Sequence, residues 1–403
     1  MANEKKIELT PNEYMVFAQQ IIESNEALID QGKQPIAVNV EGEKGIGKTE
    51  CHYAISQDNG YTLCKINLGQ FEMVGDLLGY NVKEFQLIND MDKTKTIWTL
   101  ENLVPKFCSE GWSKTDLTRT VACPPEWVVD LPEKTLLYLD DYSRANPLIM
   151  QASMELLDKR ELVGWNLPKY TQIFMSSNPD NGEYQVTTMD AAQSSRAITI
   201  GMKWSLDDWT IWSEKRKRDE RAINFVLANP ELFEDKKKDG ITGSGTIIPR
   251  MMDKFLDLVS TIPNFNDKLE YIRHIGEASI GGHATNQFIK FIHNKLDKLP
   301  SIDKLMNMDE KEGKKQLTEA CGNYEKNADS FNGASAAVIS IRLANYCLYN
   351  KIDKAQTKKL GEYITHTSFT EDQKFMIVKK IATDQKMLTT LMANAALTKY
   401  LIN

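Results

Sequence analysis

The sequence predicts an α/β protein, with a parallel sheet between helices in its first half and helices in its second half. Four short apolar runs indicate buried parallel strands; they cover residues 35–40, 61–68, 136–139 and 171–175. In the second half, apolar side chains recur at helical spacing, as in SAAVISIRLANYCLYN, which indicates packed helices. With 403 residues, the chain is long enough for two or three domains of about 150 residues each.

Composition narrows the classes of function. The net charge of −7 argues against nonspecific binding to nucleic acid or to an anionic membrane, because those surfaces attract basic proteins. The six cysteines occur singly, and the segment MANEKKIELTPNEY lacks the apolar core of a secretory signal. No apolar run reaches the roughly 18 residues that a membrane span needs. These features predict a cytoplasmic protein with reduced thiols.

The first predicted helix begins at Pro11, because Thr10 can cap it and Glu13 lies three residues after the cap. Gly32 ends this helix, and the apolar segment 35–40 follows as a strand. A glycine-rich segment comes next, then the helix-compatible TECHYAIS, then the second strand at 61–68. The order strand, glycine-rich loop, helix, strand is the setting in which a phosphate-binding loop occurs.

The glycine-rich segment matches the phosphate-binding pattern G-x-x-x-x-G-K-[ST]. Glycines permit positive φ angles and let backbone N–H groups close around phosphate oxygens, and the helix N-terminus adds positive charge. Lys48 is placed to reach the β- and γ-phosphates, and Thr49 offers a hydroxyl to Mg²⁺. The predicted nucleotide-binding residues are Gly42, Glu43, Lys44, Gly45, Ile46, Gly47, Lys48, Thr49 and Glu50.

Polar side chains follow two further apolar strands. Asp140 and Asp141 come directly after residues 136–139, and Asn178 follows residues 171–175. Because the carboxyl ends of parallel strands face the ligand crevice, we expect all three beside the phosphate loop. Asp140 and Thr49 are predicted to hold Mg²⁺, with Asp140 acting directly or through water, and Asp141 to orient the attacking water. The Asn178 amide is expected to reach the γ-phosphate or that water.

Several blocks in order give the chain a specific resemblance to the AAA+ ATPases, in particular to the MoxR-like and dynein-related branch that includes midasin and McrB. The blocks are EGEKGIGKTE, GDLLGY, LLYLDDYSRANPLIMQASMELLDKRELVGWNLP and FMSSNPDNGEYQVTTMDAAQSSRAITI, followed by lid-like segments such as WSLDDWTIW and TIIPRMMDKFLDLV. The resemblance implies a P-loop sheet of strand order 5-1-4-3-2. It also implies four segments, namely an N-terminal helix (1–33), an ATPase core (34–205), a helical lid (206–295) and a C-terminal helical bundle (296–403).

The resemblance implies roles for the matching residues and names the nucleotide as ATP. Arg196 stands where such ATPases place an arginine finger that enters the neighbouring subunit's site, and Arg250 matches the sensor 2 arginine of the lid. Taken alone, each arginine is better explained as a solvated or structural residue. Its place in the order of the blocks favours the functional role. The remaining assignments are Lys48 and Thr49 to Walker A, Asp140 and Asp141 to Walker B, and Asn178 to sensor 1.

One position departs from the family pattern. The second acid of Walker B is usually Glu, whereas Asp141 is shorter by one methylene. A misplacement near 1 Å can cost on the order of 10²-fold in rate, so we expect slow hydrolysis. The alternatives are that the backbone moves to compensate, or that another acid such as Glu41 or Asp76 assists.

An insert separates the second strand from Walker B. MoxR-like chains carry loops there that face the ring's pore or a partner. Its aromatic residues either grip a substrate or pack the insert on the core; they include Trp98, Trp112 and Trp127. The C-terminal bundle is interpreted as a docking or oligomerisation module.

Three functions remain open at this point. The first is an ATP-driven homo-oligomer, a hexameric ring that remodels a protein partner, as MoxR-like ATPases do with partners that carry a von Willebrand A domain. The second is a nucleic-acid motor like McrB, which the acidic composition disfavours. The third is a scaffold that binds ATP with little turnover. The shorter Asp141 is compatible with this function, because it predicts slow hydrolysis.

Overall fold

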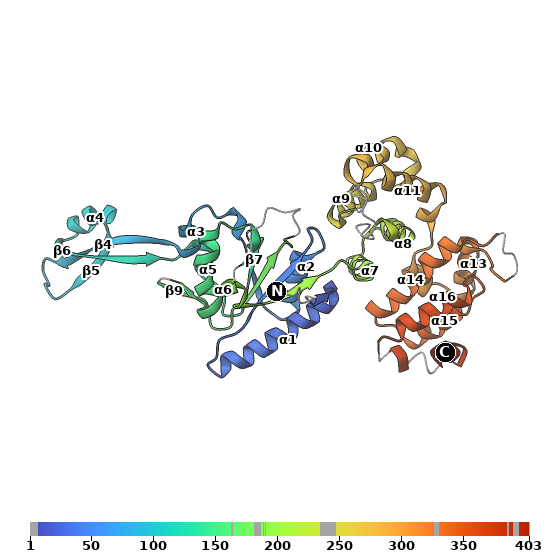
Figure 1. Cartoon of the computed structure of the whole chain (residues 1–403), viewed down its shortest axis with the longest axis horizontal. Helices are drawn as coiled ribbons and strands as arrows, with labels where there is room; N and C mark the ends of the chain where they lie inside the picture. Colours follow the sequence, from blue (N-terminus) through green and yellow to red (C-terminus); the bar gives the residue numbers. More distant parts are fainter. Residues whose placement is uncertain are drawn as a thin grey trace. The chain divides into compact units, whose positions relative to one another are not determined.

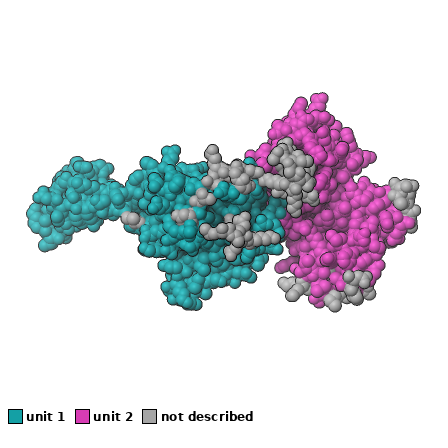
Figure 2. All heavy atoms as spheres, in the orientation of Figure 1, with its two compact units in different colours: residues 1–204 teal, residues 205–403 magenta. Residues whose placement is uncertain are grey.

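The computed structural model describes residues 7–162, 164–180, 187, 189, 191–233, 247–325, 330–384, 387–389 and 395–402. The chain divides into two compact units, Met1–Trp204 and Ser205–Asn403 (Figure 2). We describe each unit by itself.

Unit 1 contains a parallel central sheet with the strand order β1-β11-β2-β10-β7-β3 (Figure 1). Counted from β2 in chain order, its strands follow the order 5-1-4-3-2, which confirms the predicted topology. A two-residue strand, β1, extends the sheet by pairing parallel to β11, and the sequence did not predict it. The strands are β1 (Glu8–Leu9), β2 (Ala37–Gly42), β3 (Thr62–Asn67), β7 (Thr135–Asp140), β10 (Gln172–Ser177) and β11 (Ala197–Met202).

Helices cover both faces of this sheet, because successive strand residues point to opposite sides. Tyr138 packs in a cluster with α1 and α2, whereas its neighbours Leu137 and Leu139 pack in a second cluster with α3 and α5. The capping box between Thr10 and Glu13 is present at the start of α1, as predicted. The helices of unit 1 outside the insert are α1 (Pro11–Asp30), α2 (Lys48–Asp58), α3 (Val74–Leu78), α5 (Pro147–Lys159) and α6 (Ala191–Ser194), with 3-10 turns η1 (Leu68–Gln70), η3 (Glu126–Val128) and η4 (Tyr142–Arg144).

The insert forms an antiparallel sheet of its own, which we call the arm (residues 80–123; Figure 1). Trp98 lies within the arm, where the Arg119 guanidinium is 4.6 Å from its ring. Trp127, just after the arm, instead packs edge-on against Trp165 of the core, with ring centroids 5.4 Å apart. Of the three tryptophans, Trp98 and Trp112 thus lie in the arm and Trp127 packs on the core. The elements are β4 (Tyr80–Asn89), β5 (Thr96–Leu100), η2 (Glu101–Leu103), α4 (Val104–Ser109) and β6 (Trp112–Cys123), and the core hairpin is β8 (Glu161–Leu162) with β9 (Trp165–Asn166).

The described residues of unit 2 form helices joined by loops, without strands, and pack into two main apolar clusters. One surrounds Phe288 of α11, and the other surrounds Leu343 of α14. A small third cluster joins α8 to α14 through Ile223, Leu227 and Val338. The elements are α7 (Leu206–Lys215), α8 (Glu220–Ala228), η5 (Pro230–Leu232), α9 (Pro249–Ser260), η7 (Phe265–Lys268), α10 (Leu269–Ser279), α11 (Gly281–His293), η8 (Leu296–Lys298), α12 (Ile302–Asn307), α13 (Glu310–Cys321), α14 (Gly333–Tyr349), α15 (Lys354–Ile364), α16 (Glu371–Ile381) and α18 (Ala395–Ile402).

A search of the described helices finds none whose length and apolar character would let it cross a bilayer.

Candidate active site

The glycine-rich loop connects the carboxyl end of β2 to the start of α2. Gly47 is the residue before α2 and has φ +101°, and Gly45 has φ +79°. A Cβ atom on Gly42 would lie 2.7 Å from the carbonyl oxygen of Met202 on the neighbouring strand β11. Positive φ and this close approach both require glycine. The loop therefore has the backbone freedom that a phosphate cradle needs.

Lys48 bends back over this loop. Its Nζ donates to the carbonyl oxygens of Gly42 and of Glu43, the latter at 3.2 Å, and to Oδ1 of Asn178 at 3.2 Å. These three acceptors are neutral oxygens. An anionic phosphate can replace such contacts with stronger, charge-assisted ones.

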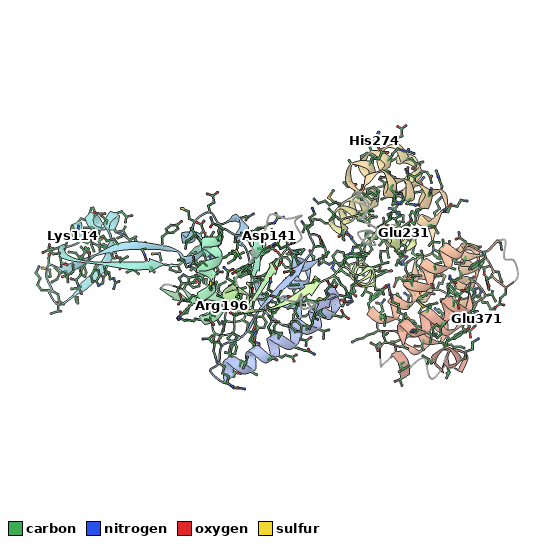
Figure 3. All side chains as sticks on the ribbon, viewed as in Figure 1. Lys114, Asp141, Arg196, Glu231, His274 and Glu371 are labelled. Atoms are coloured by element: carbon green, nitrogen blue, oxygen red, sulfur yellow. The ribbon has the colours of Figure 1, made fainter. Side chains whose placement is uncertain are left out.

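Asn178 links the lysine to Asp141, the second of the two acids after β7. Its Nδ2 donates to Oδ1 of Asp141 at 3.3 Å, and its backbone N–H donates to Oγ of Ser143 at 3.0 Å. Asp141 has a left-handed backbone with φ 52° directly after β7. Lys48, Asn178 and Asp141 thus form one hydrogen-bonded row at the carboxyl edge of the sheet, as the motif positions predict (Asp141 is labelled in Figure 3).

Asp140 is more enclosed than Asp141 and receives several donors. Lys65 forms an ion pair with its Oδ2 at 2.7 Å, and its Oδ1 accepts from Oγ of Ser176 at 2.7 Å and from the Tyr138 hydroxyl at 2.9 Å. Burial alone would raise the pKa of the Asp140 carboxyl, but hydrogen bonds from Lys65, Ser176 and Tyr138 outweigh it and lower that pKa. The carboxylate is therefore held ionised.

The residues predicted for Mg²⁺ fit a magnesium site. Oγ1 of Thr49 lies 3.5 Å from the Tyr138 hydroxyl, and that hydroxyl also donates to Oδ1 of Asp140. The Thr49 hydroxyl and the Asp140 carboxylate, the two oxygen ligands predicted for the metal, therefore lie on either side of one phenol. Mg²⁺ prefers oxygen ligands and keeps several of its waters. Because both oxygens of Asp140 already accept protein hydrogen bonds, this side chain suits contact through water.

Sequence reasoning missed the buried groups beneath the loop. His52 is fully buried, its Nδ1–H donates to the carbonyl of Lys48 at 2.8 Å, and its Nε2 accepts from the Tyr14 hydroxyl at 2.9 Å. Its ring stacks on Tyr138 with centroids 4.0 Å apart. Burial lowers the pKa of His52 to about 4, so the ring is neutral. The available signal was Tyr138, a polar-tipped residue within an otherwise apolar run, whereas nothing in the mixed segment TECHYAIS indicates that His52 is buried.

Of the two candidate arginines, Arg196 belongs to the same unit as this row but lies away from it. Arg196 precedes β11, whose first residue Ala197 pairs with the first residue of β2, Ala37. It therefore lies at the amino edge of the sheet, about 20 Å from the loop by the rise of six strand residues, and it pairs with Asp158 at 3.9 Å (Arg196 and Asp141 are labelled in Figure 3). Arg250 is exposed in the first turn of α9 in unit 2. The structure does not bring Arg196 to the site of its own chain.

Comparison with solved structures gives weak overall similarity. The RuvB Holliday junction branch migration motor of Thermotoga maritima is 11% identical with a TM-score of 0.34, covering 72% of this chain and 73% of that one. A mutant of the same RuvB gives 11% and 0.35, covering 89% and 92%. Hsp104 in a closed state with ATPγS and casein gives 14% and 0.31, covering 70% of this chain and 45% of that one. With TM-scores this low, these similarities carry no argument about the site. Its chemistry is therefore argued from the residues of this chain alone.

No family model matches the chain. No curated protein matches it either.

Proposed function

We propose that this chain is a Mg²⁺-dependent AAA+ ATPase of the MoxR type, acting as a homo-oligomeric ring that remodels a protein partner. The observation that carries the proposal is the hydrogen-bonded row of Lys48, Asn178 and Asp141 at the carboxyl edge of a 5-1-4-3-2 sheet. That row supplies a cation for phosphate, an amide and a carboxylate within one short span.

Each residue of the row has a task in hydrolysis. Lys48 exchanges its carbonyl partners for the β- and γ-phosphates, and Asp141 with the Asn178 amide orients a water for attack on the γ-phosphorus. Thr49 and Asp140 are the residues that would hold Mg²⁺, which would supply positive charge to the phosphate oxygens. Arg250 is proposed as the lid arginine that contacts the nucleotide.

Replacing Asp141 tests the hydrolytic role. Asp141→Asn should keep ATP affinity, because Lys48 and the loop are unchanged, but should lower the hydrolysis rate by about 10²-fold or more, as a lost positioning group does. Affinity is measured by calorimetry and hydrolysis by phosphate release. Asp58→Asn, the same chemical change at the exposed end of α2, is the control and should leave both unchanged. Equal hydrolysis by Asp141→Asn and wild type would remove Asp141 as the catalytic acid.

A mixing experiment tests the ring. Arg196→Ala should bind ATP but hydrolyse it poorly if Arg196 acts on the neighbouring subunit, and Lys48→Ala should not bind ATP at all. Mixed together, the two variants should recover activity, because an intact Lys48 site can then meet an intact Arg196. Hydrolysis by a strict monomer, independent of protein concentration, would contradict the ring.

The partner is proposed to be a protein, plausibly one with a von Willebrand A domain. The arm favours a protein over nucleic acid, because residues 80–123 contain six basic and six acidic side chains and offer no net charge to a phosphate backbone. Asp141→Asn with ATP should act as a trap from which a stoichiometric protein is recovered after nuclease treatment. Nucleic acid alone, released above about 200 mM salt, would instead support a nucleic-acid motor.

A further inference from the structure

Tyr138 places its hydroxyl between the two residues predicted to hold Mg²⁺, which lie on different elements. The hydroxyl donates to Oδ1 of Asp140 on β7 at 2.9 Å and lies 3.5 Å from Oγ1 of Thr49 on α2. The side chain itself is fully buried. One buried phenol therefore touches both halves of the candidate magnesium site.

The position of Tyr138 in the strand explains this reach. Residues two apart on a strand point to the same face, so Tyr138 and Asp140 share the side that α2 covers. The neighbours at 136, 137 and 139 are all leucine, so the hydroxyl distinguishes position 138 from the rest of this apolar run. A buried phenol requires a hydrogen-bond partner, and Asp140 supplies it.

The direction of the hydrogen bonds follows from the chemistry of the three groups. An ionised carboxylate only accepts, so the Tyr138 proton points to Asp140 and the phenol oxygen turns its lone pairs elsewhere. A hydroxyl that binds a cation presents a lone pair to it and must direct its own proton away. If the Thr49 hydroxyl binds Mg²⁺ in this way, its proton points away from the metal. The Tyr138 oxygen, 3.5 Å away, is placed to accept that proton.

The Tyr138 ring is itself held in place. It stacks on His52 at an interplanar angle of 20°, and His52 is tied to the Lys48 carbonyl and to Tyr14 of α1. The phenol therefore has little freedom to leave the position between Thr49 and Asp140.

We propose that Tyr138 is a positioning residue that couples Thr49 to Asp140, so that the Mg²⁺-dependent part of nucleotide affinity depends on its hydroxyl. This inference rests on the proposed ATPase function. It concerns Mg²⁺ rather than phosphate, because the loop residue that Tyr138 contacts is Thr49, which is predicted to hold the metal.

The test compares ATP affinity with Mg²⁺ and with EDTA, by calorimetry, in wild type and Tyr138→Phe. The variant keeps the ring and its stacking and loses only the hydroxyl. Groups that orient metal ligands typically contribute about 10- to 100-fold to metal affinity, so the enhancement of ATP affinity by Mg²⁺ should fall by about 10-fold or more. Affinity in EDTA should stay at the wild-type value.

Tyr61→Phe is the matched control. Tyr61 is also buried in unit 1 and also donates to a carboxylate, Glu26 at 2.8 Å, but it precedes β3 at the amino edge of the sheet. Its loss should leave the Mg²⁺ enhancement unchanged.

Two results would overturn the inference alone. One is an unaltered Mg²⁺ enhancement in Tyr138→Phe, and the other is an equal loss with and without Mg²⁺, which would mean a purely structural role. A wild type that binds no ATP would overturn the proposed function and this inference with it.

Discussion

Two polar clusters, one in each unit, hold their charges in opposite ways. In unit 1, Lys48 contacts carbonyl and amide oxygens, and the side chain of Asp141 is 36% exposed. In unit 2, Arg342 of α14 is 2% exposed and meets Glu214 of α7 at 2.7 Å and Glu220 of α8 at 2.8 Å.

The difference separates charges that can exchange partners from charges that cannot. Burial disfavours the Arg342 charge, yet the hydrogen bonds and charges of Glu214 and Glu220 outweigh burial and raise the pKa of Arg342. Its guanidinium also donates to Asn224 at 3.0 Å. A ligand has nothing to gain there, because every change leaves a buried charge unpaired. The Arg342 cluster joins the α7–α8 pair to α14, whereas the row in unit 1 is the site that we propose for phosphate.

The largest effect on stability is expected from the closed cluster. Arg342→Met leaves Glu214 and Glu220 without their cation, and breaking a buried ion pair costs about 3–5 kcal/mol. Hydrogen-exchange mass spectrometry of peptides from α7 and α14 should show the loss of protection. Arg273→Met, at an exposed position of α10, is the control and should change little. Unchanged protection in Arg342→Met would show that apolar packing alone holds these helices together.

A smaller effect is expected from His52, which connects the open row to the core beneath it. Because burial lowers its pKa from an ordinary value of about 6.5 to about 4, the unfolded chain binds a proton that the folded chain excludes. The stabilising effect is complete above about pH 6.5 and is lost as the pH falls towards 4, a total of about 3 kcal/mol.

The measurement is the urea midpoint of unit 1 at several pH values, followed by circular dichroism. His52→Phe keeps a ring against Tyr138 and should flatten the slope between about pH 4 and 6.5 relative to wild type. His274→Phe, which removes an exposed histidine of α10, should keep the wild-type slope. Parallel profiles for wild type and His52→Phe would contradict a neutral buried His52.

The smallest effect is expected at the open row itself. Asp141→Asn should change the free energy of unfolding by less than about 0.5 kcal/mol, as for other surface substitutions, because the side chain is partly exposed and Asn tolerates the left-handed backbone. Glu214→Gln is the same change in the closed cluster, where the side chain is 8% exposed, and should destabilise more. Urea unfolding of the two variants, compared with wild type, distinguishes them. Similar losses would mean that the two clusters are held alike.

The sequence by itself determined the features that depend on neighbours along the chain. Gly45 and Gly47 have positive φ angles, which their glycine-rich loop predicts. The capping box of α1 joins residues three apart. The strand that ends at Asp140 is predicted by its run of leucines. The strand order came from the resemblance of ordered blocks to a family, and the observed sheet confirms it. Local steric preferences and periodicity involve only a few consecutive residues. The structure that they favour can therefore be predicted from the sequence alone.

Only the tertiary structure decided which distant side chains meet. Lys65 reaches Asp140 because β3 pairs with β7 in a particular register, Asn67 opposite Asp140. Tyr138 reaches Thr49 because α2 lies on the face to which even-numbered residues of β7 point. Arg342 meets Glu214 across 128 residues of sequence. No periodicity encodes such pairs, since each contact depends on the packing of whole elements, and buried polar groups require partners wherever that packing places them.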